Sequence, residues 1–559
     1  EIRLSLVGSE MCIRDRDMTA VEGLLSMAVL KDKCLPQATH QQIEHIHESL
    51  LFYDEHTFGA SESVSDPLCE NSQVQWGEKS AYAWEAVKRT QMLYETSVGL
   101  LQGDLRRGKN PTLTIFNTLN WKRSEMLTVY IDFEVIPRNQ FFEITDFQGH
   151  SLKVQPIRYR REGCYYAIFA EDIPPMGYKT FEIVFKQPST DTGTITINNA
   201  SIENHFYKLQ LNPDKGTIQS LYDKELNCEL VDSSSPWELG AFIYEKLGNR
   251  DQLAQYRLDD YNRTGLSECR IIDSSNGPIY QRILLQGKSP GTDEAFGVNL
   301  EIKLYHDTKR IELEYAIKRL PETDPSGIYV AFPFQLPEGK LAFDVQGGTV
   351  ISGKNQLEGT STDWNTVQNF VSVQNNQAQI IIGSSLIPLY QLGDINLGKF
   401  QYQKQYERPH VYSWVMNNYW NTNFKASQEG EFRWSYHLTS SVDPSNNLAT
   451  KFGWSSRIPL YARVMPTGTE NHKPTEYSAF HFEKDNFLMT SCTPSKEEGY
   501  ILLNIREIDG KRTNLRILNE DGQTIPFTIV NAIEEKLENE TSEHIFEGYQ
   551  NKFIKIKRF

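Results

Sequence analysis

The sequence has 559 residues, of which 39% are hydrophobic and 23% are charged, the composition of an ordinary globular protein with room for about three or four domains. The net charge of −16 argues against nucleic-acid binding, because contact with a phosphate backbone needs clustered Lys and Arg. No run of about 18 apolar residues occurs, so we expect no membrane-spanning segment. The seven cysteines are scattered without a CxxC pair, which favours neither a disulfide framework nor a thiolate metal site, and we expect a cytoplasmic protein.

Residues 1–16 (EIRLSLVGSEMCIRDR) carry a short apolar patch but neither the apolar core nor the cleavage site of a signal peptide. Residues 5–16 resemble the translation of a sequencing adapter. We therefore expect residues 1–16 to be artefactual or disordered, the natural sequence to begin near Asp17, and the true N-terminus to be missing. The alternative is a natural disordered N-terminus.

Residues 17–108 are predicted to form a three-helix domain, because apolar residues recur there at helical spacing. Thr39 is placed to cap the second helix. The third helix follows a loop rich in Ser, Asp and Pro over residues 61–71. The apolar positions are Val21, Leu24, Leu25, Met27 and Leu30, then Ile43, Ile46 and Leu50, then Ala83, Ala86, Val87, Met92, Leu93, Leu100 and Leu101.

From residue 110 onward the hydrophobic period changes to two, which predicts β-strands up to the last residues. Residues 306–309 (HDTK) separate two alternating runs and predict a hairpin. So long a region of strands favours stacked antiparallel sandwiches over a parallel sheet. We expect sandwiches over residues 109–190, 191–470 and 471–559, so the fold class is mainly β with an N-terminal α domain.

Two acids and a histidine stand together at Asp54, Glu55 and His56, between the second helix and Gly59. A glycine just past a helix suits the left-handed turn that ends it. Paired carboxylates serve glycosidic bond cleavage, and Asp and His are ligands for a divalent metal. The alternative is a solvated polar loop.

A second candidate is the loop over residues 417–423 (NNYWNTN). Amides hydrogen-bond sugar hydroxyls and an indole face stacks on a sugar ring. Asn417, Asn418, Trp420 and Asn423 are therefore candidate substrate-binding residues. The alternative is that the tryptophan closes a sandwich core.

Several segments, in one order over residues 17–559, resemble the family 38 glycoside hydrolases, the α-mannosidases. The helical trio before a very long β region resembles that family as well. The segments are residues 53–59 (YDEHTFG), which resemble the DEHTWG turn of the bacterial branch, 115–121 (IFNTLNW), 202–207 (IENHFY), 216–224 (GTIQSLYDK), 417–424 (NNYWNTNF) and 432–436 (FRWSY).

The resemblance implies a galactose-mutarotase-like super-sandwich in the β region and a metal-dependent, retaining hydrolysis of α-mannosyl linkages. In that family an α/β barrel supplies an H-x-D pair and a nucleophilic aspartate, and the divalent metal is usually zinc. None of the twelve histidines here begins an H-x-D sequence. We therefore expect a C-terminal fragment that lacks the barrel and is inactive alone.

Alignment on Gly59 implies that Asp54 is a metal ligand and that Glu55 is a catalytic, sugar-contacting carboxylate, with His56 as the rival ligand. The implied partners are α-mannoside glycans. Assembly into a homo-oligomer is possible and is not decided by the sequence. We expect the 54–56 turn and the 417–423 loop to share one side of the molecule, beside an apolar face where the barrel would dock. The rival from another class is a non-catalytic carbohydrate-binding β-sandwich protein, and a third interpretation is a purely structural sandwich array.

Overall fold

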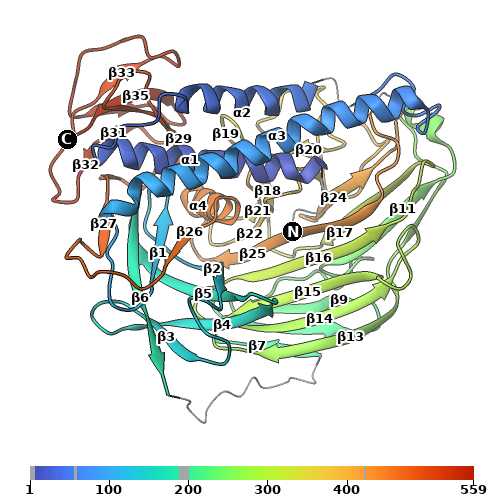
Figure 1. Cartoon of the computed structure of the whole chain (residues 1–559). Coiled ribbons are helices and arrows are strands. Elements are labelled where there is room, and N and C mark those ends of the chain that lie inside the picture. The colour runs from blue at the N-terminus through green and yellow to red at the C-terminus, as the bar shows by residue number, and fades with distance from the viewer. Residues whose placement is uncertain (1–6, 56–58, 188–199, 421–423) are drawn as a thin grey trace.

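The computed structural model describes residues 7–55, 59–187, 200–420 and 424–559, with side chains from residue 17 onward. A helical layer lies across a body of antiparallel sheets, and the C-terminal strands form a separate lobe at one end of the helices (Figure 1). The predicted fold class, mainly β after an N-terminal α region, is confirmed. Within the described residues, no helix is both long and apolar enough for a membrane crossing.

The helical layer consists of three helices, α1 (Val7–Leu30), α2 (Thr39–Asp54) and α3 (Glu70–Leu101). Helix α1 starts ahead of Asp17, and the side chains of residues 1–16 lie outside the description, so the expectation about that segment stays a prediction. From Met18 onward almost every residue of α1 is buried. A helix that is apolar on all sides must be covered on all sides.

Helix α1 is buried because two cores meet on it. One side contributes Met18, Val21 and Leu25 to the interior of the bundle with α2 and α3. The other side contributes Leu24 and Met27 to the core of the C-terminal lobe. The three helices and the last strands therefore form one packed unit.

The first sandwich is an eight-stranded sheet in the order β2-β5-β4-β3-β6-β1-β26, with β27 paired to β6. Its apolar residues alternate as predicted: Leu127, Val129 and Ile131 are buried between exposed neighbours. The strands are β1 (Thr112–Asn117), β2 (Arg123–Asp132), β3 (Phe141–Thr145), β4 (Ser151–Tyr159), β5 (Gly163–Ile173), β6 (Gly177–Lys186), β26 (Tyr461–Met465) and β27 (Glu476–Ser478).

The large sandwich stacks a six-stranded and a four-stranded sheet on a nine-stranded sheet (Figure 1). The predicted hairpin is present, since β15 and β16 pair antiparallel across residues 306–310. The six-stranded sheet contains β11 (Ala241–Leu247), β12 (Tyr261–Thr264), β17 (Ser326–Phe332), β20 (Asn365–Thr366), β23 (Leu389–Leu392) and β24 (Val411–Asn417). The nine-stranded sheet contains β13 (Ser267–Asn276), β14 (Tyr280–Lys288), β15 (Val298–Tyr305), β16 (Ile311–Arg319), β18 (Lys340–Val345), β19 (Gly348–Ile351), β21 (Phe370–Gln374), β22 (Gln379–Gly383) and β25 (Gly430–Ser441). The four-stranded sheet contains β7 (Ser201–Glu203), β8 (Tyr207–Asn212), β9 (Thr217–Asp223) and β10 (Cys228–Glu229).

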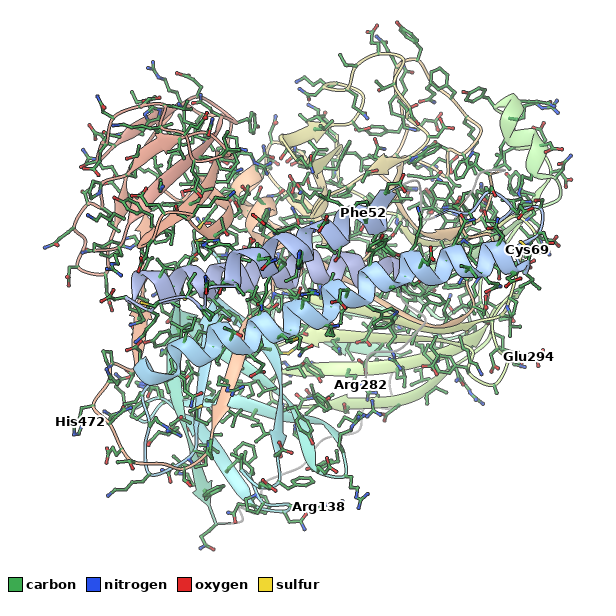
Figure 2. The ribbon with its side chains drawn as sticks, turned by 45° about the horizontal axis from the view of Figure 1, so that its top comes forward. Phe52, Cys69, Arg138, Arg282, Glu294 and His472 are labelled. Atoms are coloured by element: carbon green, nitrogen blue, oxygen red, sulfur yellow. The ribbon has the colours of Figure 1, made fainter. Side chains whose placement is uncertain are left out.

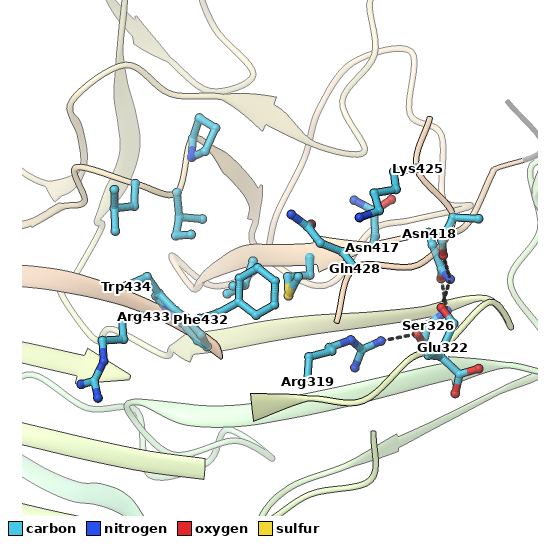
Figure 3. A pocket seen from close by; sticks show the side chains of 16 residues that line it. Arg319, Glu322, Ser326, Asn417, Asn418, Lys425, Gln428, Phe432, Arg433 and Trp434 are labelled. Carbon is cyan, nitrogen blue, oxygen red and sulfur yellow. Dashed lines mark hydrogen bonds between the residues drawn. The ribbon is translucent and has the colours of Figure 1, made fainter. Parts of the chain in front are cut away.

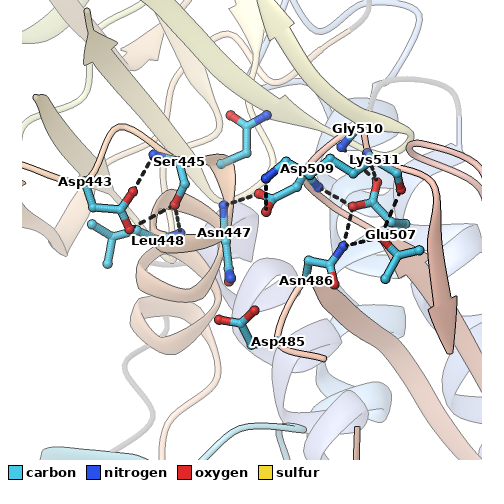
Figure 4. A network of polar contacts seen from close by, with 12 residues as sticks. Asp443, Ser445, Asn447, Leu448, Asp485, Asn486, Glu507, Asp509, Gly510 and Lys511 are labelled. Carbon is cyan, nitrogen blue, oxygen red and sulfur yellow. Dashed lines mark hydrogen bonds and ion pairs between the residues drawn. The ribbon is translucent and has the colours of Figure 1, made fainter. Parts of the chain in front are cut away.

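The C-terminal lobe is joined to the large sandwich by α4 (Asn446–Arg457) and a polar network at its start (Figure 4). Ser445 caps α4 by accepting a hydrogen bond from the Leu448 N–H, and the Asn447 N–H donates to Asp509 of the lobe. The buried Glu507 accepts four backbone N–H groups and the Asn486 amide, so its charge is fully solvated by the protein. The strands of the lobe are β28 (His481–Phe482), β29 (Phe487–Pro494), β30 (Tyr500–Glu507), β31 (Thr513–Leu515), β32 (Ile517–Leu518), β33 (Thr528–Val530), β34 (His544–Phe546) and β35 (Asn551–Lys557).

Three details differ from the sequence analysis. Thr39 is the first residue of α2 and its buried hydroxyl makes no hydrogen bond, since Ala38 occupies the cap position. Helix α4 interrupts the strand region, although it was not predicted. The boundary expected at residue 470 does not follow the sheets, because β26 and β27 return to the first sandwich.

Leu24→Ala should lower the free energy of unfolding by about 2–5 kcal/mol, because Leu24 is fully enclosed between the bundle and the C-terminal lobe. Leu51→Ala on the outer face of α2 is the matched control: Leu51 is 72% exposed, so the change should stay within about 0.5 kcal/mol. Urea unfolding measures both values. Equal effects would contradict the central position of α1.

Candidate active-site turn and adjoining pocket

The two acids of the 54–56 turn stand at the end of α2 with their side chains exposed. Ile43, Ile46, Leu50 and Tyr53 are buried on the inner face, so the helix phase turns Asp54 and Glu55 outward. The helix ends at Asp54, and Glu55 is already extended, with its N–H donating to the Leu51 carbonyl. The helix therefore ends before Gly59 and needs no left-handed glycine there.

Lys79 on α3 holds the turn in place. Its ammonium donates to the Glu55 carbonyl over 2.6 Å and lies 3.3 Å from the Glu55 carboxylate. The Lys79 side chain is 17% exposed whereas that of Glu55 is 57% exposed, so the lysine is the fixed partner. This contact orients Glu55 while leaving part of its carboxylate in solvent.

The same stretch of α3 also meets the loop that follows β24. Trp76 lies one turn before Lys79 and is buried, and the Lys425 ammonium lies 5.3 Å from the centre of its ring. This is cation–π distance. The 54–55 turn and Lys425, which follows the second candidate loop, therefore approach neighbouring turns of one helix. The expectation that the 417–423 loop itself shares a side with the turn stays a prediction.

A pocket of about 290 Å³ opens beneath that loop (Figure 3). Its polar lining includes Arg319 at the end of β16, Asn417 at the end of β24, and Lys425 and Gln428 from the loop before β25. Its apolar wall includes Phe432 and Trp434. Among the lining residues, sequence analysis proposed only Asn417 and Asn418 as substrate contacts; Phe432, Arg433 and Trp434 belong to the 432–436 segment named there without a role, and Arg319, Lys425 and Gln428 belong to no motif named there.

The polar groups of this pocket are mostly donors without partners. No hydrogen bond from the side chains of Asn417, Lys425 or Gln428 to another described residue is present. Trp434 is 3% exposed and its indole N–H has no acceptor among the described residues. Of these donors only the Trp434 indole is buried, whereas Asn417, Lys425 and Gln428 are half-buried and can also meet solvent.

Asn418 plays a structural part instead. Its carbonyl accepts the Ser326 N–H over 2.7 Å, and its amide donates to the Glu322 and Ala426 carbonyls. The Asn418 side chain thereby connects the backbone at Ser326, Glu322 and Ala426. Both of its amide hydrogens are used in these bonds, so neither is left to donate to a sugar hydroxyl. The predicted substrate contact of Asn418 therefore has no support in this geometry.

Trp420 packs among aromatic rings rather than standing over the pocket. Its ring centre lies 5.3 Å from that of Trp364 and 5.5 Å from that of Trp414. This matches the alternative in which the tryptophan closes a core. Asn423 and His56 lie outside the described residues, so their predicted roles stay predictions.

Burial shapes the electrostatics of the pocket. Arg319 is 7% exposed, and this burial lowers the pKa of its guanidinium. Glu322 is the one acid in the described lining, and it lies 3.3 Å from the Lys246 ammonium. The pocket thus carries more positive than negative charge.

The described residues contain no group of three His, Cys, Asp or Glu side chains placed to hold a metal ion. Asp54 is the only candidate ligand among them, and one carboxylate is far short of the four donors of a zinc site. We therefore derive no chemical step through a metal from this chain.

Six large apolar side chains are exposed along α2, α3 and the loop joining them, among exposed charged and amide residues. Phe52 stacks on Tyr82 with 5.4 Å between ring centres, and Phe52 lies on the outer side of α2 (Figure 2). The six side chains are those of Leu51, Phe52, Leu68, Val74, Tyr82 and Met92. Exposed apolar surface of this extent is typical of an interaction face.

Asn418→Ala should lower the free energy of unfolding by about 1–3 kcal/mol, because it leaves the buried Ser326 N–H and two carbonyls unpaired. Its neighbour Asn417 is the control: Asn417→Ala should change stability by less than about 0.5 kcal/mol, since no hydrogen bond is lost. Thermal unfolding of the two variants compares them directly. A larger loss for Asn417→Ala would reverse the two assignments.

Residues 202–400 match the sequence profile described as the glycosyl hydrolases family 38 C-terminal domain. A comparison with curated proteins finds no match.

Two solved structures from Enterococcus faecalis superpose over almost the whole chain. One is described as an alpha-mannosidase, with a TM-score of 0.75, 13% identity, and coverage of 99% of this chain and 67% of that one. The other is described as a protein in glycosyl hydrolase family 38, with a TM-score of 0.74, 13% identity, and coverage of 99% and 70%. At this identity the structures show a shared fold. Residues 202–400 are similar to the C-terminal domain of the family 38 glycosyl hydrolases, within a chain that shares the fold of these two structures over almost its whole length.

Proposed function

We propose that this chain is part of a retaining, metal-dependent α-mannosidase. The observation that carries the proposal is the meeting of the Glu55 turn and the donor-lined pocket on one stretch of α3, through Lys79 and Lys425. Glycoside hydrolysis needs carboxylates beside a site that binds sugar hydroxyls. In this proposal the turn would supply a carboxylate and the pocket would bind the hydroxyls. The profile match supports a glycosidase at the level of the family.

In this proposal Glu55 binds sugar hydroxyls and Lys79 holds it in position. Asp54 or His56 would be one ligand of a divalent metal, zinc by resemblance, which would polarise sugar hydroxyls and stabilise developing charge. The nucleophilic aspartate and the remaining ligands would come from residues outside this sequence. The natural enzyme would be cytoplasmic, with α-mannoside glycans as substrates.

The exposed apolar side chains of α2, α3 and the loop joining them would then be covered by that additional part of the protein. About a third of each superposed Enterococcus faecalis chain lies outside the matched region, which leaves room for such a part. Phe52 and Tyr82 would be buried in the contact.

In an enzyme extended by its upstream reading frame, Asp54→Ala should lose metal and aryl α-mannosidase activity together. Glu55→Ala should keep the metal and lose about 10–100-fold in activity, as neighbours of a metal ligand commonly do. Glu48→Ala, an exposed acid on α2 away from the turn, is the control and should change neither property. Elemental analysis and turnover are measured on the same samples.

His56→Ala tests the rival ligand. If His56→Ala removes the metal while Asp54→Ala retains it, the histidine is the ligand and the role given to Asp54 is wrong. If both variants keep the metal, the turn takes no part in metal binding.

The 559-residue chain itself should show no turnover of an aryl α-mannoside with zinc, cobalt, manganese or calcium added, because the proposal places the nucleophile outside it. Binding of mannose without hydrolysis in the extended protein as well would favour the rival, a non-catalytic carbohydrate-binding protein. Hydrolysis by the chain alone would overturn the assignment of the nucleophile to an outside segment.

A further inference from the structure

The pocket beneath the 425–428 loop contains a buried arginine that lacks a carboxylate partner. Three arginines are buried among the described residues, namely Arg123, Arg319 and Arg506. Arg123 lies 2.7 Å from Glu125 and Arg506 lies 3.5 Å from Asp344.

Arg319 has no such ion pair with a described residue. Its Nη2 donates to the Ser326 hydroxyl over 2.8 Å, its guanidinium lies 5.7 Å from the centre of the Tyr244 ring, and its enclosed Nη1 has no geometric hydrogen bond there. A buried guanidinium without a counter-charge is costly, because desolvation is not offset by ion pairing. The protein therefore keeps at this position a charge that no contacting carboxylate balances.

Two further cations line the same pocket. The Lys425 ammonium contacts the Trp76 ring and makes no ion pair with another described residue. Arg433 lies 3.5 Å from Glu314, at the edge of hydrogen-bonding distance, and its side chain is 49% exposed. Glu322, the acid of the lining, lies 3.3 Å from Lys246, which also pairs with Asp324 at 3.1 Å and does not line the pocket.

The remaining polar groups of the lining favour an acceptor-rich ligand. The amides of Asn417 and Gln428 and the indole N–H of Trp434 can each donate a hydrogen bond. Charge-assisted bonds from Arg and Lys to phosphate or carboxylate oxygens are about twice as strong as neutral ones. The excess of positive charge in the pocket lining contrasts with the net charge of −16 of the whole chain.

We propose that this pocket binds an oxyanion, a phosphate or carboxylate group carried on the sugar ligand. Arg319 supplies the buried counter-charge, and Lys425 supplies a second positive charge from the loop. Phe432 and Trp434 form a buried apolar part of the lining, with the Trp434 ring stacked on Tyr315. The sugar part of this inference rests on the proposed function, whereas the oxyanion part rests on the charges of the pocket alone.

Calorimetric titration of the full chain with mannose 6-phosphate, mannose and inorganic phosphate tests the proposal. Mannose 6-phosphate should bind about tenfold or more tightly than mannose, and added NaCl should weaken its binding. Lys425→Gln should remove most of that preference, and Lys425→Arg should retain it. Because Lys425 is only half-buried, both variants are expected to fold, which thermal unfolding checks.

Lys179→Gln is the matched control. Lys179 also lies over an aromatic ring, 5.5 Å from the centre of Phe181, but in the first sandwich away from the pocket. It should leave the preference unchanged. Equal losses in Lys179→Gln and Lys425→Gln would show a nonspecific charge effect and overturn the site.

The remaining outcomes separate the two proposals. If mannose and mannose 6-phosphate bind equally, the oxyanion site is overturned while the proposed mannoside function stands. If glucose 6-phosphate binds as tightly as mannose 6-phosphate, the oxyanion site holds and the mannose specificity fails. Absence of binding by all of these probes at millimolar concentration overturns the oxyanion site.

Discussion

Burial of α1 between the helical bundle and the C-terminal lobe is the constraint on which the rest of the structure depends. Because Leu24 faces one core and Leu25 the other, the bundle cannot shift against the strands without opening both. That fixed position determines where α3 runs across the β body. Lys425 consequently reaches Trp76, and Glu55 reaches Lys79. The geometry of the candidate site therefore depends on the packing of α1.

Neighbouring residues of similar chemistry are used in opposite ways around the pocket. Asn418 places its whole amide on backbone groups, and Asn417 beside it makes no such bond. Likewise, Arg123 is paired with Glu125, whereas Arg319 donates only to a hydroxyl. The satisfied groups hold the walls, and the unsatisfied groups are the ones available to a ligand. A distinction of this kind depends on partners, not on residue type.

The change of hydrophobic period near residue 110, the three helices, the hairpin at 306–309 and the buried faces of β2 and β35 were all predictable from the sequence, because each depends on neighbours along the chain. The exposed acids at the end of α2 were predictable for the same reason. The start of α2, helix α4 and the return of β26 to β1 were not, since caps and strand partners are chosen by tertiary contacts. Arg319, Lys425 and Gln428 come together only when β16 and the loop before β25 are folded side by side.

The return of β26 and β27 has a consequence for how the protein is made. Strand β1 pairs with β6 on one side and with β26 on the other, yet β26 follows it by more than 300 residues. During synthesis that edge of the first sheet stays open until the whole large sandwich has left the ribosome, tens of seconds later at about 5–20 residues per second. An open edge strand can pair with strands of other molecules, so the nascent chain passes through a long interval in which β1 lacks its native partner on that side.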